Sequence, residues 1–264
     1  MSLFNIFFLH LQQVFYHRLR SLVWFFIPLM NNLTLILFWS GALKNTAPVA
    51  NWNMSYIATY YFLLTIAEAL LSSHIEEDVA SIDIQQGYLV RYLLRPFPYY
   101  WIKCIEEVPY RLLQGSYGVI LLVSFSFIFS NLIHISSDPI VLGMSAIIFV
   151  LAYFLSYTMK INLGLSAFWF IDSRGFFELF TIILIIFSGG IVPLHLFPAP
   201  VQTLSYILPF AYSGYFPIIA LQGQLGVMQL FQVMGVQIFW LGCLLLLNRT
   251  LWNNGIKQFT AFGQ

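Results

Sequence analysis

Charged residues are scarce in this sequence. Only 8% of its 264 residues are Asp, Glu, Lys or Arg, while 60% are hydrophobic and 19% are aromatic. Soluble domains carry about one quarter charged residues, and apolar runs here consume almost the whole chain. The composition therefore predicts an integral membrane protein with no soluble domain. The net charge of +1 and the lack of a basic run give no support for nucleic acid as a partner.

Cysteine is also scarce. Cys104 and Cys243 are the only two in the sequence, and each lies in or beside an apolar segment with no Cys or His at metal-ligand spacing. We therefore expect neither a disulfide nor a zinc site. The first twenty residues lack the basic start, uninterrupted apolar middle and small-residue cleavage site of a secretory signal, so we expect them to be retained.

Known catalytic motifs are missing from the sequence. It contains no Gly-x-x-x-x-Gly-Lys-Ser/Thr loop, and no Lys directly follows a glycine, so the chain cannot hold nucleotide phosphates as a P-loop does. His-Glu-x-x-His, Gly-x-Ser-x-Gly and paired carboxylates at membrane depth are absent as well. We expect no catalytic residue, no metal and no other cofactor in this chain, and any ATP hydrolysis in another subunit.

The apolar segments predict six membrane-spanning helices in one transmembrane domain over residues 1–264. Residues 2–20 place Leu3, Phe7 and Leu11 on one face, the pattern of an amphipathic elbow helix lying in the membrane interface. The predicted fold class is therefore all-α integral membrane. The spans cover about residues 22–43, 54–73, 108–133, 140–160, 176–192 and 227–247.

The basic residues are unevenly distributed between the two sides of these spans. Ten of the eleven Lys and Arg residues flank the spans on one side, and only Lys44 lies on the other. Cytoplasmic flanks of membrane proteins retain Lys and Arg. Both termini are therefore predicted to be cytoplasmic.

Residues 74–107, between spans two and three, form the only long polar stretch, and they lie on the predicted cytoplasmic side. Acidic residues begin it, and Arg91 and Arg95 follow. Such a charged surface suits docking to a soluble partner, and ordinary solvated surface charge explains it equally well. Its acidic residues are Glu76, Glu77, Asp78, Asp83, Glu106 and Glu107.

The most unusual segment covers residues 188–223, on the predicted outer side. Its apolar run is interrupted by Gly189, Gly190, Pro193, Pro198 and Pro209. An internal proline removes a backbone donor and clashes with the preceding turn, so this run cannot be one straight helix. Lipid tolerates broken backbone only where it is buried in protein or lines a cavity, which favours re-entrant helices at a pathway. An apolar outer loop is the alternative.

A few polar side chains fall inside the predicted spans. Asn31, Asn32 and Thr34 interrupt span one, and Glu68 lies about five residues from the cytoplasmic end of span two. Hydrogen bonds or ion pairs between helices are one explanation, and the lining of a substrate pathway is the other. Glu178, one turn into span five, suits the positive end of that helix.

Three local sequences match a known pattern. Ser-Gly-Gly-Ile-Val-Pro-Leu runs from Ser188 to Leu194, Leu208-Pro209-Phe210 is followed by Tyr212, and Gly87-Tyr88-Leu89 lies in the polar stretch. With the elbow helix, six spans, coupling loop and re-entrant segment, they resemble the membrane subunit of type-2 ABC exporters, the ABC-2 permease family. The resemblance covers nearly the whole chain and is to a poorly characterised bacterial branch, in which two related permeases often accompany one ATPase.

The resemblance implies a multi-pass permease that exports a hydrophobic or amphiphilic molecule, such as a drug, lipid or glycolipid, across the bacterial cytoplasmic membrane. ATP and Mg²⁺ would bind to a separate ATP-binding subunit, present in two copies. A second permease, identical or related, would complete a dimer surrounded by membrane lipid. The re-entrant helices would close the outer end of the path. The implied contacts with the ATPase are Glu76, Glu77, Asp78, Asp83 and Arg91.

Two other classes of protein remain open. An ion-coupled secondary transporter needs ionisable residues at mid-membrane and usually an inverted repeat, and the sequence shows neither. A membrane enzyme that modifies lipids needs clustered Asp, His or Ser near one face, and Glu106, Glu107 and Arg111 form the best such cluster. Purification in mild detergent discriminates between the classes, because a co-purifying ATPase favours export.

Overall fold

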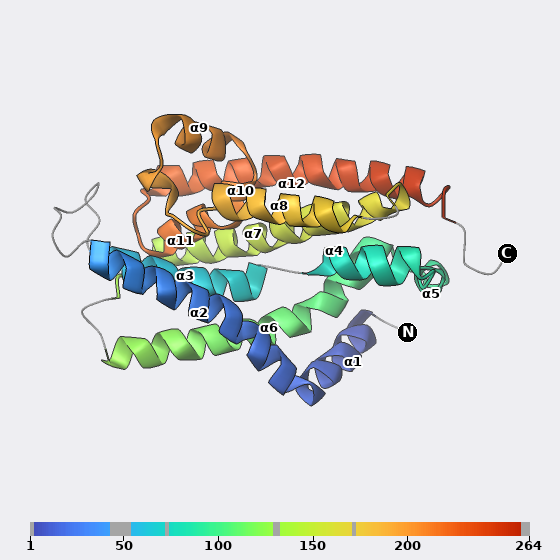
Figure 1. Cartoon of the computed structure of the whole chain (residues 1–264), viewed down its shortest axis with the longest axis horizontal. Coiled ribbons are helices and arrows are strands. Elements are labelled where there is room, and N and C mark those ends of the chain that lie inside the picture. Colours follow the sequence, from blue (N-terminus) through green and yellow to red (C-terminus); the bar gives the residue numbers. More distant parts are fainter. Residues whose placement is uncertain (1–2, 43–53, 72–73, 129–132, 171–172, 260–264) are drawn as a thin grey trace.

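The computed structural model describes residues 3–42, 54–71, 74–128, 133–170 and 173–259. Within these ranges every regular element is a helix. Long helices run roughly side by side along the molecule (Figure 1). Helices α4 and α5 lie at one end, together with α1 and the last turns of α12, and helices α9 and α11 lie at the other.

The N-terminal pair of helices turns sharply at His17. Helix α1 (Leu3–Tyr16) occupies the positions of the predicted amphipathic helix, and α2 (Arg18–Ala42) follows at an angle to it (Figure 1). Pro28 lies inside α2, where it removes one backbone hydrogen bond of the helix. Phe4 and Phe8 of α1 are exposed, which suits lipid contact, and the interfacial position of α1 stays a prediction.

The predicted polar stretch 74–107 is mostly helical. Helix α3 (Met54–Leu71) is followed by α4 (Ile75–Glu77), which continues as the π-helix η1 (Asp78–Gln85), and by the short helix α5 (Val90–Leu93). Helix α6 (Tyr99–Ile128) begins about nine residues before the predicted start of span three. Charged residues occur in its first turns, and the helix includes them because each is paired with another charged side chain of the fold.

Helix α7 (Pro139–Leu165) has a strong start signal. The Asp138 carboxylate accepts the backbone N–H of Ile140 at 2.9 Å, and proline occupies the first helical position. A 3₁₀ turn, η3 (Ser166–Phe168), and helix α8 (Arg174–Phe187) follow. Helix α8 ends five residues before the predicted end of span five, because Gly189 takes a left-handed conformation with φ +79°.

The broken segment, residues 188–223, contains four short elements, and a long final helix follows it. The elements are η4 (Leu194–Leu196), α9 (Ala199–Ile207), α10 (Phe210–Ser213) and α11 (Tyr215–Leu221). Pro193, Pro198 and Pro209 each lie immediately before one of them, where a missing backbone N–H costs nothing. Helix α12 (Val227–Gly255) begins where span six was predicted to begin.

Four described helical stretches are long and apolar enough to cross a membrane. They are Arg18–Ala42, Met54–Gln85, Pro139–Phe168 and Val227–Gly255. Helices α6 and α8 are not among them. With 14 residues, α8 is about 21 Å long at ~1.5 Å per residue, shorter than a hydrocarbon core of about 30 Å. The count of six spans therefore stays a prediction.

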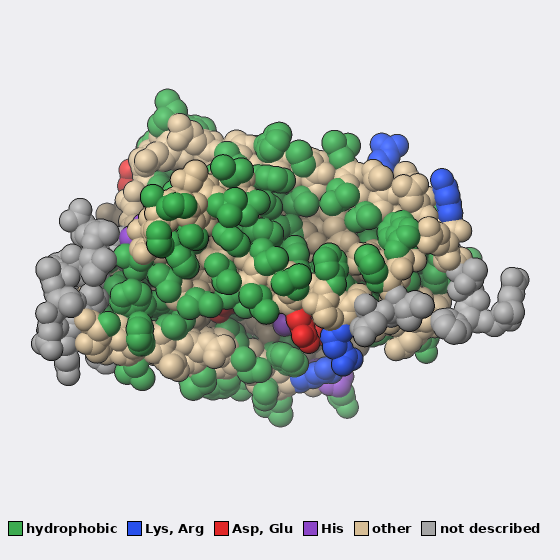
Figure 2. Space-filling model, turned by 45° about the horizontal axis from the view of Figure 1, so that its top comes forward, with side chains coloured by type: hydrophobic (Ala, Val, Ile, Leu, Met, Phe, Trp, Pro, Cys, Tyr) green, Lys and Arg blue, Asp and Glu red, His purple; other side chains and the backbone are tan. Residues whose placement is uncertain are grey.

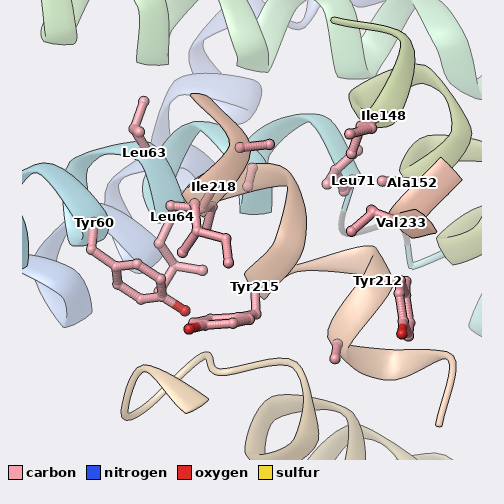
Figure 3. Packing of buried hydrophobic residues seen from close by; sticks show 14 of the residues in the cluster. Tyr60, Leu63, Leu64, Leu71, Ile148, Ala152, Tyr212, Tyr215, Ile218 and Val233 are labelled. Carbon is pink, nitrogen blue, oxygen red and sulfur yellow. The ribbon is translucent and has the colours of Figure 1, made fainter. Parts of the chain in front are cut away.

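The two larger of three buried apolar clusters lie towards the two ends of the described part of the molecule. The larger joins α3, α7, α11 and α12, and Figure 3 shows Tyr60, Ile148, Ile218 and Val233 from these helices within it. The other packs η1 against α6 and α7 around the fully buried Ile102. Hydrophobic side chains also cover most of the outer face in Figure 2, and Lys and Arg gather towards the α5 end. A lipid-facing surface explains this distribution.

Candidate functional site

A cavity of about 950 Å³ lies between helices α2, α3, α6, α7 and α8. Its wall extends from α4 and η1 to Gly190 and Gly214 of the broken segment. Asn31 and Glu68, two of the predicted pathway residues, contribute to this wall. The cavity therefore reaches both segments that the sequence singles out, the predicted coupling stretch and the broken segment.

Asn32 and Thr34 do not line this cavity, contrary to the prediction. Asn32 is buried, and its Nδ2 donates to Glu68 Oε2 at 2.9 Å and to Thr65 Oγ1 at 3.0 Å. It thus joins α2 to α3, the hydrogen-bonding role that the sequence left open. Thr34 is exposed, and its hydroxyl donates to the carbonyl oxygen of Met30 in its own helix at 2.8 Å.

A buried ion pair fixes α4 to α7 in the part of the cavity wall that is furthest from the broken segment. Lys160 Nζ donates to Glu76 Oε1, and both side chains are only 3% exposed. One turn earlier on α7, Ser156 donates to the carbonyl oxygen of Leu71, the last residue of α3, at 2.6 Å. Glu76 is therefore enclosed and positions α4 in this structure, and its role as an ATPase contact stays a prediction.

Asp83 is also enclosed and accepts from three donors. Tyr99 Oη lies 2.7 Å from Asp83 Oδ2, Lys103 Nζ lies 2.6 Å from the same oxygen, and Arg91 Nη2 lies 3.4 Å from Oδ1. The side chain of Asp83 has 0% exposure. Asp83 therefore holds η1 against α5 and α6 in this structure, and its role as an ATPase contact stays a prediction.

Glu106 connects this region to the N-terminal helix. Its carboxylate accepts from Tyr92 at 2.9 Å and lies 3.4 Å from Arg95 and 3.6 Å from His10 of α1. Burial alone would raise the pKa of Glu106, but the neighbouring His10, Lys103 and Tyr92 outweigh it, so the pKa lies below its usual value. The sequence cluster of Glu106, Glu107 and Arg111 is therefore structural in this fold.

Three of the predicted contacts reach the surface, and one of them, Arg91, belongs to an apolar tip. Glu77, Asp78 and Arg91 are exposed. The tip covers residues 86–94, turns at Gly87 with φ +79°, and exposes Tyr88 by 53%, Leu93 by 46% and Leu94 by 83%. Exposed apolar side chains next to charges are typical of a protein-protein contact. Sequence reasoning missed the apolar part, although it quoted Gly87-Tyr88-Leu89 as a motif.

The broken segment is held to α3 through its backbone. Tyr60 donates to the carbonyl oxygen of Gly189 at 2.8 Å, and Tyr61 donates to that of Ile191 at 2.7 Å. The hydroxyl groups of Tyr60 and Tyr215 point towards each other beside this segment (Figure 3). The tyrosines thus satisfy carbonyl groups that the broken helix leaves without a helical partner.

A glutamine of α12 holds the other side of the broken segment. Gln237 has 0% exposure, and its Nε2 donates to the carbonyl oxygens of Tyr212 at 2.9 Å and Ile148 at 3.1 Å. Like Tyr60 and Tyr61, it lies in an apolar helix, and the sequence offered only its polarity as a signal. No group of three His, Cys, Asp or Glu side chains suited to a metal ion occurs among the described residues.

Comparison with known proteins agrees with this geometry. The family model described as ABC-2 family transporter protein matches residues 29–263. Neither the curated proteins nor the solved structures give a match to the chain. The matched region includes the tip, the broken segment and all of the cavity wall except residues 24–28 of α2. The chain therefore belongs to the ABC-2 transporter family, as a multi-pass permease subunit that works with an ATP-binding partner.

Proposed function

We propose that this permease exports a hydrophobic or amphiphilic molecule through the cavity, driven by a separate ATP-binding subunit. The observation that carries the proposal is the cavity itself, whose wall extends from α4 and η1 to Gly190 of the broken segment. Its wall combines aromatic and aliphatic side chains with a few polar groups, as sites for amphiphilic ligands do. The tyrosine hydrogen bonds to Gly189 and Ile191 support a closed outer end in this conformation.

The tip is the proposed docking surface for the ATP-binding subunit. Leu94 is its most exposed apolar side chain, and Arg91 is an exposed charged residue of the same tip. The gathering of basic side chains at this end supports a cytoplasmic location for the tip and for both termini (Figure 2). Two ATP-binding subunits and a second permease, identical or related, would complete an exporter in the bacterial cytoplasmic membrane.

Co-purification with the ATP-binding subunit tests the docking surface. Leu94→Glu should reduce recovery of that subunit and lower transport-linked ATPase activity, because a charge replaces an apolar contact. Gln258→Glu is the matched control, since it adds the same charge at an exposed residue outside the tip. The melting temperature of the permease should not change in either variant. Normal assembly and transport with Leu94→Glu would rule out the tip as the docking surface.

Thiol labelling of intact cells tests the orientation. In a chain whose exposed Cys243 is replaced by Ser, Thr203→Cys in α9 should react with an impermeant reagent, and Gln258→Cys after α12 should not. Both residues are exposed in the structure, so accessibility from one side of the membrane decides the result. The opposite labelling pattern would place the tip outside the cell, where no ATP-binding subunit could reach it.

A further inference from the structure

Glu68 is the carboxylate of the cavity wall that no basic side chain neutralises. Asn32 donates to its Oε2 at 2.9 Å, and this partner is a neutral amide. Among the described residues, Oε1 has no hydrogen-bond donor and the carboxylate has no Lys or Arg within ion-pair distance. The side chain is partly exposed where it lines the cavity. An ionised carboxylate in such a place attracts a cation.

The basic residues of the same wall are already balanced. Lys160 is paired with Glu76. Arg111 lies 2.6 Å from Glu107 and 2.9 Å from Gln114, and it is 5% exposed.

Near the start of α8, two further residues of the wall carry opposite charges and are exposed. Arg174 and Glu178 lie four residues apart, so they share one face of the helix. At the mouth, Glu77 is exposed to solvent. Of the wall carboxylates with no ion pair among the described residues, Glu77 and Glu178 are exposed, and Glu68 is the one that is largely enclosed.

The surroundings of Glu68 suit the rest of a cationic amphiphile. Trp24, Phe25 and Phe177 line the same cavity, and aromatic faces attract organic cations. Towards the broken segment the wall continues with aliphatic side chains, including Ile182 and Ile185. Such a surface can receive an apolar body while the charged head stays at the carboxylate.

We propose that the cargo is an amphiphile with a positively charged organic head, an amine or quaternary ammonium, and that Glu68 is its specificity residue. The proposal rests on the proposed function, which makes the cavity the export path. Asn32 fixes the orientation of the carboxylate, leaving Oε1 for the cargo. A bound cation favours the ionised carboxylate in return. An anionic amphiphile of the same size is rejected by the same charge.

Binding of two lipophilic ions of similar size and opposite charge tests this proposal. The probes are tetraphenylphosphonium and tetraphenylborate, added at pH 8 to the full chain in nanodiscs of phosphatidylcholine. The cation should bind saturably and more tightly than the anion. Glu68→Gln should weaken cation binding roughly tenfold, the effect of losing one charge contact in a partly shielded site. Glutamine still accepts the hydrogen bond from Asn32, so the helix contact is kept.

Asp138→Asn is the matched control for a general change in surface charge. Asp138 is exposed outside the cavity, and asparagine still caps α7, so cation binding should be unchanged. Unaltered cation binding in Glu68→Gln, or a preference for the borate, would overturn the proposal.

Transport separates this proposal from the proposed function. In the complex with the ATP-binding subunit, ATP-dependent efflux of tetraphenylphosphonium should fall with Glu68→Gln and persist with Asp138→Asn. If the rate of ATP-dependent efflux were the same with and without Glu68→Gln, the role of Glu68 would be overturned and the export function would be retained. Cation binding that requires Glu68, with no ATP-dependent efflux of any amphiphile, would instead overturn the export function and leave the cation site.

Discussion

Adding one methyl group at Gly189 would test the outer end of the cavity most directly. The backbone of Gly189 has φ +79°, and a Cβ built there would lie 2.6 Å from the hydroxyl oxygen of Tyr60. Tyr60 has 0% exposure and donates to the carbonyl oxygen of Gly189 at 2.8 Å, so its ring cannot move aside without losing this hydrogen bond. Gly189→Ala should therefore separate α3 from the broken segment.

The loss in free energy of unfolding expected for Gly189→Ala is the sum of two contributions. An L-residue in the left-handed conformation costs about 1–2 kcal/mol. A buried hydroxyl or carbonyl group left without its partner costs about 1–3 kcal/mol. The free energy of unfolding should therefore fall by about 2–5 kcal/mol. Gly143 of α7 gives the matched control, because nothing lies within 4 Å of the position its Cβ would take. Gly143→Ala should be neutral or stabilising by up to about 1 kcal/mol.

Thermal unfolding in one detergent, followed by tryptophan fluorescence, measures the difference. Gly189→Ala should melt roughly 4–20 °C below Gly143→Ala, from about 2–4 °C per kcal/mol for a chain of this size. Tyr60→Phe removes the oxygen that the new methyl group would meet. The loss in free energy of unfolding in the double variant Tyr60→Phe with Gly189→Ala should therefore be smaller than the sum of the losses in the two single variants. If Gly189→Ala melted at the same temperature as Gly143→Ala, the close approach of Tyr60 to Gly189 would be refuted.

Three further predictions concern the inner and middle parts of the fold. Lys160→Met should lower the free energy of unfolding by about 3–5 kcal/mol, because it leaves Glu76 buried and unpaired. The double variant with Glu76→Met should recover most of this loss. Equal melting temperatures of the single and the double variant would contradict the prediction. Asn32→Ala should lower the free energy of unfolding by about 1–3 kcal/mol, because Asn32 joins α2 to α3. Asn31→Ala should lower it by less than about 0.5 kcal/mol. Equal melting temperatures of the two variants would contradict the prediction. The pKa of Glu106 is lower in the folded state than in the unfolded state, so its ionised carboxylate stabilises the fold above the unfolded-state pKa. This stability is lost as the pH falls below about 4.5. Glu106→Gln should therefore flatten the dependence of the free energy of unfolding on pH in that range, and an unchanged slope would exclude this contribution.

The helices follow from sequence wherever local signals decide them. Asp138 followed by Pro139 predicts a helix start, and α7 begins there. The start of α6 could not be found in this way, because the charges of Lys103 and Glu106 look solvated in a hydropathy profile. Their neutralisation depends on Asp83 of η1 and on Arg95, and a profile of one segment contains no information about contacts with another.

The site was less predictable than the fold for the same reason. An acidic run predicts a charged surface, but Glu76 finds Lys160 at a separation of 84 residues. The partner of Gly189 lies further still, since Tyr60 is 129 residues away along the chain. A tyrosine in an apolar helix has many ordinary explanations, among them the membrane interface. Only the three-dimensional packing shows that this hydroxyl serves the broken segment.

Helix α3 contacts both regions that export would have to coordinate. In its outer half, Tyr60 and Tyr61 hold the backbone of the broken segment. Its last residue, Leu71, accepts the hydroxyl of Ser156, and the next helix along the chain is fixed to the same face of α7 by Glu76. Helices α3 and α4 are thus held by Ser156 and Lys160, which lie one turn apart on α7. Because α3 is a single helix, its contact with α7 at Leu71 and its contacts with Gly189 and Ile191 belong to one element of the fold.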